Sequence, residues 1–315
     1  MESIIENVEE TLNDVNTRWG ASTDEIKRHM NGYVLVGNDN SDILEYKTKN
    51  GLVVVAYQFH LDKLCAAVVK SLKDTESTSD SNDILSNFNY VGETGGKNIY
   101  TNETDNVFAV KYEITEEEKI YLTIGFTPLK PMVEQVSGKD CVDLGINRKW
   151  ATCNIGASSP DASGGYFAWG EVAEKDSYSW DTYELTTGSL SGCLDLGESI
   201  SGTQYDAATK LWGNMWVTPT ESDVNELIKN CSWVWSSENG VKGYKVFGKN
   251  GNYMFVPASG FKRPALQSSG SYGYYMTAMP DKTTGNCKVL IFNSTEKELG
   301  KNYRCRGFVV RAVVK

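Results

Sequence analysis

The sequence predicts an α+β protein of two domains. The composition changes near residues 127–140: all seven prolines lie at or after Pro128, seven of the eight tryptophans lie at or after Trp150, and 21 of the 29 glycines follow residue 136. Before this point, helix and strand patterns recur in the same order. After it, short strand-like runs alternate with Gly- and Ser-rich loops. We therefore expect an α+β domain at 1–130, a second domain at 137–315, and a linker over 127–140.

The N-terminal domain is expected to repeat a unit of one helix and three strands. Ser22 and Glu25 form a capping-box pattern that starts a helix with Ile26 and Met30 on one face. A second, shorter helix pattern covers 83–88. Three strand-like runs follow each helix, at 42–47, 52–59 and 63–70, and then at 98–101, 106–113 and 119–126. Helices on one face of an antiparallel sheet are an α+β arrangement. The pattern resembles the αβββ modules of bacterial envelope lipoproteins.

The C-terminal domain shows two helix patterns. Thr218 is expected as the N-cap of a helix with Pro219 at its first position, and Glu221 completes a capping box. The apolar face of this helix consists of Val224, Leu227, Ile228 and Cys231. A shorter helix is expected to end at Gly213. Strands are expected at 244–248, 252–258, 288–292 and 307–314.

One further strand is expected at "KWATCNIGA", residues 149–157. Alternation places Cys153 on its apolar side, so we predict that Cys153 is a buried free thiol. An irregular loop follows at 156–168. A tryptophan buries a large area and can satisfy one N–H group, so we expect Trp169 to anchor this loop.

The charge is unevenly distributed along the chain. Residues 1–136 carry 23 acidic and 12 basic side chains, a net charge of −11, whereas residues 137–315 carry 18 and 19, a net charge of +1. Neither half has the basic footprint of a nucleic-acid-binding protein. The longest apolar runs, about four to six residues, fall far short of the roughly 20 that a transmembrane helix needs. We therefore expect no nucleic-acid partner and no transmembrane segment.

The sequence offers no recognisable catalytic or metal-binding constellation. The seven cysteines are at least 12 residues apart, which excludes CxxC motifs. We expect mostly free thiols, with one or two disulfides in the second half as the alternative for an exported protein. The only histidines are His29 and His60, so the second domain lacks a His base and His ligands for zinc. The "GKNGN" run at 248–252 predicts a hairpin turn. We therefore expect no cofactor and no metal.

Five motifs occur in order over about 142–314. They are "VDLGINRKWATCNIGASSPDASGGYFAWGE", "YDAATKLWGNMWVTPTESDVNELIKNCSWVW", "GYKVFGKNGNYMFVPASGF", "GYYMTAM" and "RCRGFVVRAVV". This series closely resembles the Fibrobacter succinogenes major paralogous domain, a family of exported and surface proteins of gut bacteria. That family is similar to the C-type lectin-like fold of formylglycine-generating enzymes and retroelement variable proteins. The resemblance implies a C-type lectin-like domain after the αβββ-repeat domain.

The resemblance also implies where a ligand would bind. Formylglycine generation requires a close cysteine pair near the C-terminus, but Cys287 lies 18 residues before Cys305. The "EPN", "QPD" and "WND" motifs of calcium-dependent lectins are absent. In the retroelement variable proteins, ligand contacts come from the segment that corresponds to 271–306, whose composition suits an adaptable binding surface. The alternative for this segment is a solvent-exposed hairpin. The candidate ligand-binding residues are Trp169, Trp212, Tyr272, Tyr274, Tyr275, Lys288, Asn293, Tyr303 and Arg304.

These observations predict a non-enzymatic protein that binds a glycan or a protein ligand through its second domain. The resemblance implies a location outside the cell, at the cell surface or in the periplasm, with a lipid anchor in the precursor as one alternative. A structural or interaction module of the bacterial envelope without a small-molecule site is the second hypothesis. An enzyme of unrecognised type is the third.

Overall fold

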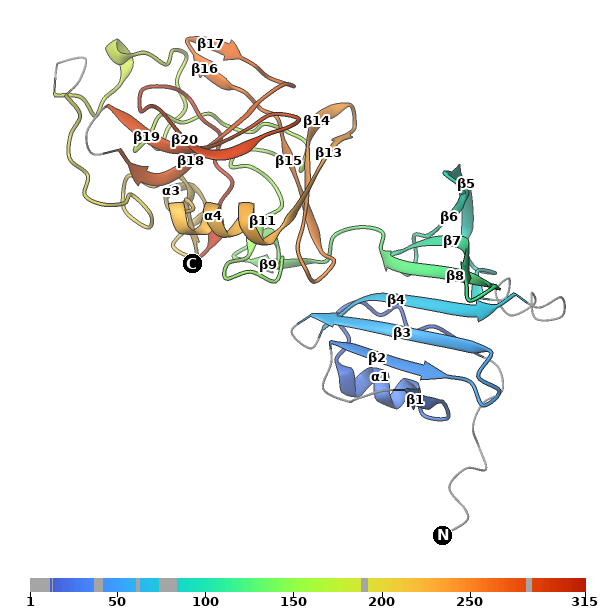
Figure 1. The fold of residues 1–315 in the computed structure, drawn as a ribbon. Coiled ribbons are helices and arrows are strands. Elements are labelled where there is room, and N and C mark those ends of the chain that lie inside the picture. Colours follow the sequence, from blue (N-terminus) through green and yellow to red (C-terminus); the bar gives the residue numbers. More distant parts are fainter. Residues whose placement is uncertain are drawn as a thin grey trace. The chain divides into compact units, whose positions relative to one another are not determined.

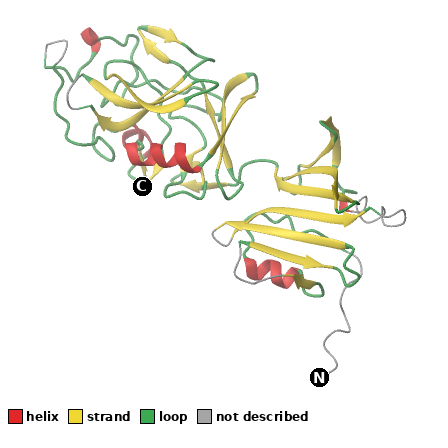
Figure 2. Cartoon of the chain, in the orientation of Figure 1, coloured by secondary structure: helices red, strands yellow, loops and turns green. Residues whose placement is uncertain are grey.

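A computed structural model of the chain describes residues 12, 14–36, 42–60, 63–73, 84–187, 192–281 and 285–315. The chain divides into two compact units, Met1–Met132 and Val133–Lys315. Strands predominate in both units (Figures 1 and 2), with 44% of the described residues in strands and 10% in helices. The predicted α+β class is therefore wrong, and the fold is mostly β-sheet with a few short helices.

The N-terminal unit is built on one eight-stranded antiparallel sheet with the strand order β1-β2-β3-β4-β8-β7-β6-β5. Its strands are β1 Val34–Val36, β2 Ile43–Lys47, β3 Val53–His60, β4 Lys63–Leu72, β5 Asn89–Thr94, β6 Lys97–Asn102, β7 Val107–Glu116 and β8 Lys119–Pro128. Helix α1, Thr23–His29, begins at the N-cap Ser22. Ser22 and Glu25 form both hydrogen bonds of the predicted capping box. Ile26 of α1 packs into the same core as Leu44 and Phe126 of the sheet.

The six predicted strands of the N-terminal unit lie in one antiparallel sheet. All six are confirmed, and β4 pairs with β8, from Ala67↔Phe126 to Leu72↔Tyr121. This pairing joins the two groups of strands, whereas the predicted α+β class is wrong because strands greatly outweigh helices among the described residues. Of the second predicted helix at 83–88, residue 83 lies outside the described residues, residue 84 is helical and residues 85–87 form a turn.

The C-terminal unit contains several small sheets. β9 Val133–Val136, β10 Lys139–Val142, β11 Trp150–Ala151, β12 Trp216–Val217 and β21 Val313–Val314 form a five-stranded sheet in the order β12-β21-β11-β10-β9. The other sheets consist of β13 Ser232–Glu238, β14 Val241–Phe247 and β15 Tyr253–Pro257; β16 Phe261–Arg263 and β17 Ala265–Gln267; and β18 Gly273–Pro280, β19 Asn286–Phe292 and β20 Lys297–Tyr303. The helices are the 3₁₀-helix η1 Trp180–Thr182, α3 Ala207–Trp212 and α4 Glu221–Asn230.

Several boundaries in the C-terminal unit differ from the predictions. Gly213 does cap α3 as expected. Helix α4 begins later, because the capping box forms between Thr220 and Asp223 rather than at Thr218. The expected linker over 127–140 contains the end of β8, all of β9 and the first half of β10, which leaves residues 129–132 between β8 and β9. The predicted closing strand at 307–314 is regular only at β21.

The strand expected at 149–157 also ends early. β11 comprises two residues, and the chain bends at 152–153. Cys153 is therefore half-buried rather than buried, because the bend breaks the alternation that would have placed it on the apolar side. The sulfur atom of Cys153 lies 3.6 Å from the hydroxyl of Thr152. All seven cysteines are free thiols.

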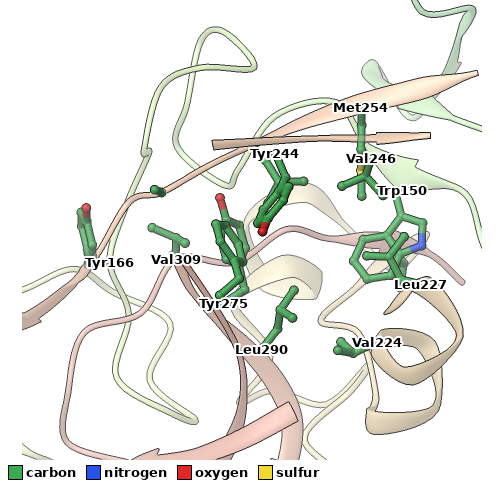
Figure 3. Close-up of a cluster of buried hydrophobic side chains, with 14 of the residues drawn as sticks. Trp150, Tyr166, Val224, Leu227, Tyr244, Val246, Met254, Tyr275, Leu290 and Val309 are labelled. Carbon is green, nitrogen blue, oxygen red and sulfur yellow. The ribbon is translucent and has the colours of Figure 1, made fainter. Parts of the chain in front are cut away.

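Buried aromatic and aliphatic side chains hold these sheets and loops together. Figure 3 shows one cluster, in which Trp150, Tyr244, Met254, Tyr275 and Leu290 come from elements far apart in the sequence. The rings of Tyr275 and Phe292 stack with their centroids 5.7 Å apart. A protein interior gains stability from such close packing even where regular strands are short.

Two buried charged side chains bind the irregular segments. Arg311 is 2% exposed and donates hydrogen bonds to Asn154 Oδ1 (2.8 Å), to the carbonyl of Phe255 (3.0 Å) and to the carbonyls of Ala151 and Thr152. Asp206 is fully buried and caps α3 by accepting from the amide of Ala208 (2.9 Å). The same carboxylate accepts from the amide and the hydroxyl of Thr218. Thr218 therefore connects two segments and does not cap α4.

Candidate functional site

The structure separates the predicted site residues into buried and accessible groups. Trp169, Tyr275 and Arg304 are buried, with exposed fractions of 0%, 3% and 6%. Tyr272 and Tyr303 are exposed, at 37% and 46%. The remaining candidates are half-buried: Trp212, Tyr274, Lys288 and Asn293. A ligand in solution would therefore meet only part of the predicted set.

The three buried residues support the fold. Trp169 donates its Nε1–H to the carbonyl of Thr277 at 3.1 Å, and the guanidinium of Arg304 lies 4.4 Å from its ring centroid. Arg304 also donates to the carbonyl of Asn286 at 3.0 Å. The hydroxyl of Tyr275 donates to the carbonyl of Pro257 at 2.7 Å. These groups face neighbouring segments of the chain and not solvent.

Three other candidates have partners at separate places. The Trp212 ring packs against Trp216 with centroids 5.3 Å apart. Lys288 forms an ion pair with Glu221 at 2.6 Å. Asn293 accepts hydrogen bonds from the amides of Thr295 (2.8 Å) and Glu296 (2.9 Å), which fixes the turn between β19 and β20. These contacts assign them to local structure rather than to one common site.

The structure brings the remaining candidates, Tyr272, Tyr274 and Tyr303, into one continuous set of contacts. Ring centroids lie 6.1 Å apart for Tyr272–Tyr274 and 4.7 Å apart for Tyr274–Phe261. The guanidinium carbon of Arg306 lies 5.1 Å from the Phe261 ring and 5.0 Å from the Tyr303 ring. Tyr303 in turn contacts Trp180 at 6.0 Å. We call this set the aromatic–arginine row: Tyr272, Tyr274, Phe261, Arg306, Tyr303 and Trp180.

Sequence reasoning missed Phe261, Trp180 and Arg306. Phe261 and Trp180 lie outside the segment 271–306, and no local pattern connects them to it. Arg306 lies at the end of that segment, two residues after the predicted Arg304. In an extended strand the two arginines would point to the same face, but the chain turns at 304–305, which buries one and leaves the other half-exposed.

Backbone hydrogen bonds hold the row in place. The amide of Gly260 donates to the carbonyl of Tyr272 at 2.7 Å, and Lys262 and Gly307 exchange hydrogen bonds at 2.9 and 3.1 Å. Gly260 has a φ of +65°, and a Cβ there would lie 2.0 Å from the carbonyl oxygen of Gln267. Only glycine permits both this conformation and this close approach.

Arg306 is the charged centre of the row. Its Nη1 donates to Asn302 Oδ1 at 2.5 Å, whereas its buried Nε has no hydrogen-bond partner within the described structure. Burial lowers the pKa of Arg306, and the nearby charge of Arg263 lowers it further. The ion pairs found among the described residues include neither arginine. The row thus combines aromatic rings with a guanidinium that retains unused donors.

The described residues contain no group of three or more His, Cys, Asp or Glu side chains placed to hold a metal ion. Within the same residues, no helix has the length and apolar character needed to cross a membrane. Comparisons with protein-family models, curated proteins and solved structures return no match to this chain.

Proposed function

We propose that this chain is a non-enzymatic, exported or cell-surface protein that binds a glycan through the aromatic–arginine row. The observation that carries the proposal is the exposure of Tyr272 and Tyr303 on a backbone held by hydrogen bonds. A pyranose ring has a face of C–H groups and an edge of hydroxyl groups. Aromatic rings offer a negative π face to the C–H groups, and tyrosine adds a hydroxyl for hydrogen bonding.

The polarity of the row favours a glycan over a broad protein partner. A stable protein interface buries about 800 Å² on each side around an apolar centre. The row has no such apolar centre. An arginine lies between its rings, and its exposed members are tyrosines, which carry hydroxyl groups. The sequence resemblance to a domain of exported and surface proteins supports the proposed location.

A glycan array probed with the full chain tests this function. We expect Tyr272→Ala and Tyr303→Ala each to weaken binding about tenfold, as central aromatic contacts do. Because both rings are partly exposed, melting temperatures should stay within about 2 °C of the parent value. Tyr90→Ala is the matched control, since Tyr90 is 58% exposed in the N-terminal unit. Binding that is unaffected by both variants, or the absence of any bound glycan, would contradict the proposal.

A further inference from the structure

We propose that the aromatic–arginine row recognises a negatively charged saccharide, with Arg306 binding its carboxylate or sulfate group and Arg263 adding a second positive charge. This inference rests on the proposed glycan-binding function and specifies the class of glycan. It follows from the hydrogen-bond donors of Arg306, from the ion pairs of the described residues, which do not include it, and from the two rings beside it.

The first argument concerns the donors that the protein leaves unused. A guanidinium has five N–H donors, and it binds a carboxylate through two of them in parallel. Nη1 of Arg306 is engaged by Asn302. Nε has no partner in the described structure, and no hydrogen bond among the described residues uses Nη2. Nε and Nη2 lie on the same side of the planar group, so together they present one free edge for a two-oxygen anion.

The second argument concerns the absence of a neutralising acid. No ion pair within the described residues involves Arg306 or Arg263. The segments of the C-terminal unit outside the described part, 188–191 and 282–284, have the sequences GSLS and KTT and carry no acidic side chain. The arginines also repel each other electrostatically. An anion from outside the chain would relieve this repulsion.

The third argument concerns the two rings that flank the guanidinium. Phe261 and Tyr303 lie 5.1 and 5.0 Å from its central carbon and keep water from Nε. A charge-assisted hydrogen bond is stronger where water is excluded. Tyr303 is 46% exposed, so a ligand can reach the ring beside this edge from solvent. The same rings would contact the sugar that carries the anion.

The test measures binding of three defined probes to the full chain by calorimetry: an oligogalacturonate, a sulfated dextran oligosaccharide and a neutral dextran oligosaccharide of equal length. We expect the charged probes to bind at least about tenfold more tightly than the neutral probe, and more weakly as NaCl increases. The two charged probes distinguish a carboxylate from a sulfate as the preferred group.

Four variants assign the preference to residues. Arg306→Gln should weaken binding of the charged probe about tenfold or more. Arg306→Lys should cause most of the same loss of affinity, because a lysine cannot present two parallel donors. Arg263→Gln should weaken binding about two- to fivefold and reduce its salt dependence. Lys229→Gln is the matched control, because Lys229 is exposed on α4 and its loss changes the net charge equally. Thermal melts confirm that each variant is folded.

The outcomes separate this inference from the proposed function. Equal binding of charged and neutral probes, weakened by Tyr272→Ala but not by Arg306→Gln, would overturn the anionic preference and leave glycan binding in place. Failure of every charged probe to bind would also overturn it, and the glycan array would then decide the proposed function separately. Charged-probe binding lost equally in the Lys229→Gln control would show that general charge, and not Arg306, is responsible.

Discussion

Single buried polar residues determine how the irregular segments of the C-terminal unit are held. Arg311 binds residues 151–154 and β15 through hydrogen bonds to the backbone and to Asn154, and Asp206 binds α3 and Thr218. Neither side chain forms an ion pair within the described residues. Arg311 and Asp206 therefore fix the positions of these segments, because each one forms hydrogen bonds with several polar groups that would otherwise be buried without a partner.

Replacing Arg311 by methionine should destabilise the C-terminal unit by about 3–5 kcal/mol. Methionine fills a similar volume but leaves Asn154 Oδ1 and the carbonyls of Ala151 and Phe255 without this donor. Urea unfolding monitored by tryptophan fluorescence measures the loss. Lys149→Met, which removes a partly exposed cation in the same unit, is the control and should cost less than about 1 kcal/mol. Equal losses in the two variants would contradict the role given to Arg311.

At the residue scale, chemical type alone predicted some roles and not others. The size of Trp169 suggested an anchor, and the structure shows it fully buried with its N–H group satisfied. Nothing in "RCRGF" distinguished Arg304 from Arg306, because the turn between them depends on contacts with distant segments. The sequence therefore predicted only part of the aromatic–arginine row. Tyr272, Tyr274 and Tyr303 belong to one predicted segment, 271–306. Phe261 and Trp180 lie outside that segment and contact it only in the folded chain.

At the scale of elements, local patterns predicted the strands but not their partners. Strand-like runs in the sequence indicated β2, β3, β4, β6, β7 and β8. Strand β1 is exposed at all three residues, so no alternation marks it, and β5 contains a register shift between Tyr90 and Gly92. The β4–β8 pairing connects residues about 50 to 60 positions apart, from Leu72↔Tyr121 to Ala67↔Phe126. Such long-range pairing depends on the complete set of apolar faces and leaves no signal in a short window.

The central position of β4 and β8 makes the N-terminal sheet sensitive to proline. Val69 pairs with Ile124, and both are buried, at 2% and 1% exposure. Val69→Pro should unfold this unit, because proline cannot donate to the ladder and is tolerated only at edges or bulges. Circular dichroism should then lose the contribution of the N-terminal unit while the tryptophan fluorescence transition, which reports mainly the C-terminal unit, persists. Val34→Pro in the exposed edge strand β1 is the control, with a small expected effect.

At the scale of the whole molecule, the chain has two compact units with separate hydrophobic cores, and buried thiols occur in both. Burial raises the pKa of Cys65, Cys231 and Cys305 from 9.0 to about 11. Between these values the folded chain keeps protons that the unfolded chain has released. The free energy of unfolding must therefore fall as the pH rises through this range.

We expect the urea midpoint, measured under reducing conditions, to be higher at pH 8 than at pH 10.5. The decrease should begin near pH 9, where unfolded thiols ionise, and continue toward about 11. Combining Cys65→Ala, Cys231→Ala and Cys305→Ala should make the decrease shallower, because these groups no longer differ in proton binding between the two states. A midpoint that rises with pH, or a slope that the triple variant leaves unchanged, would contradict this account.

The backbone bonds between Gly260 and Tyr272 and between Lys262 and Gly307 have a consequence for protein engineering. They do not involve the side chains that the surface presents. Positions 263, 266, 272 and 303 are all exposed, so a combinatorial library at these four sites should retain the scaffold while varying what it binds. The C-terminal unit would then serve as a display framework, in which the glycines are kept constant and selection acts on the exposed side chains alone.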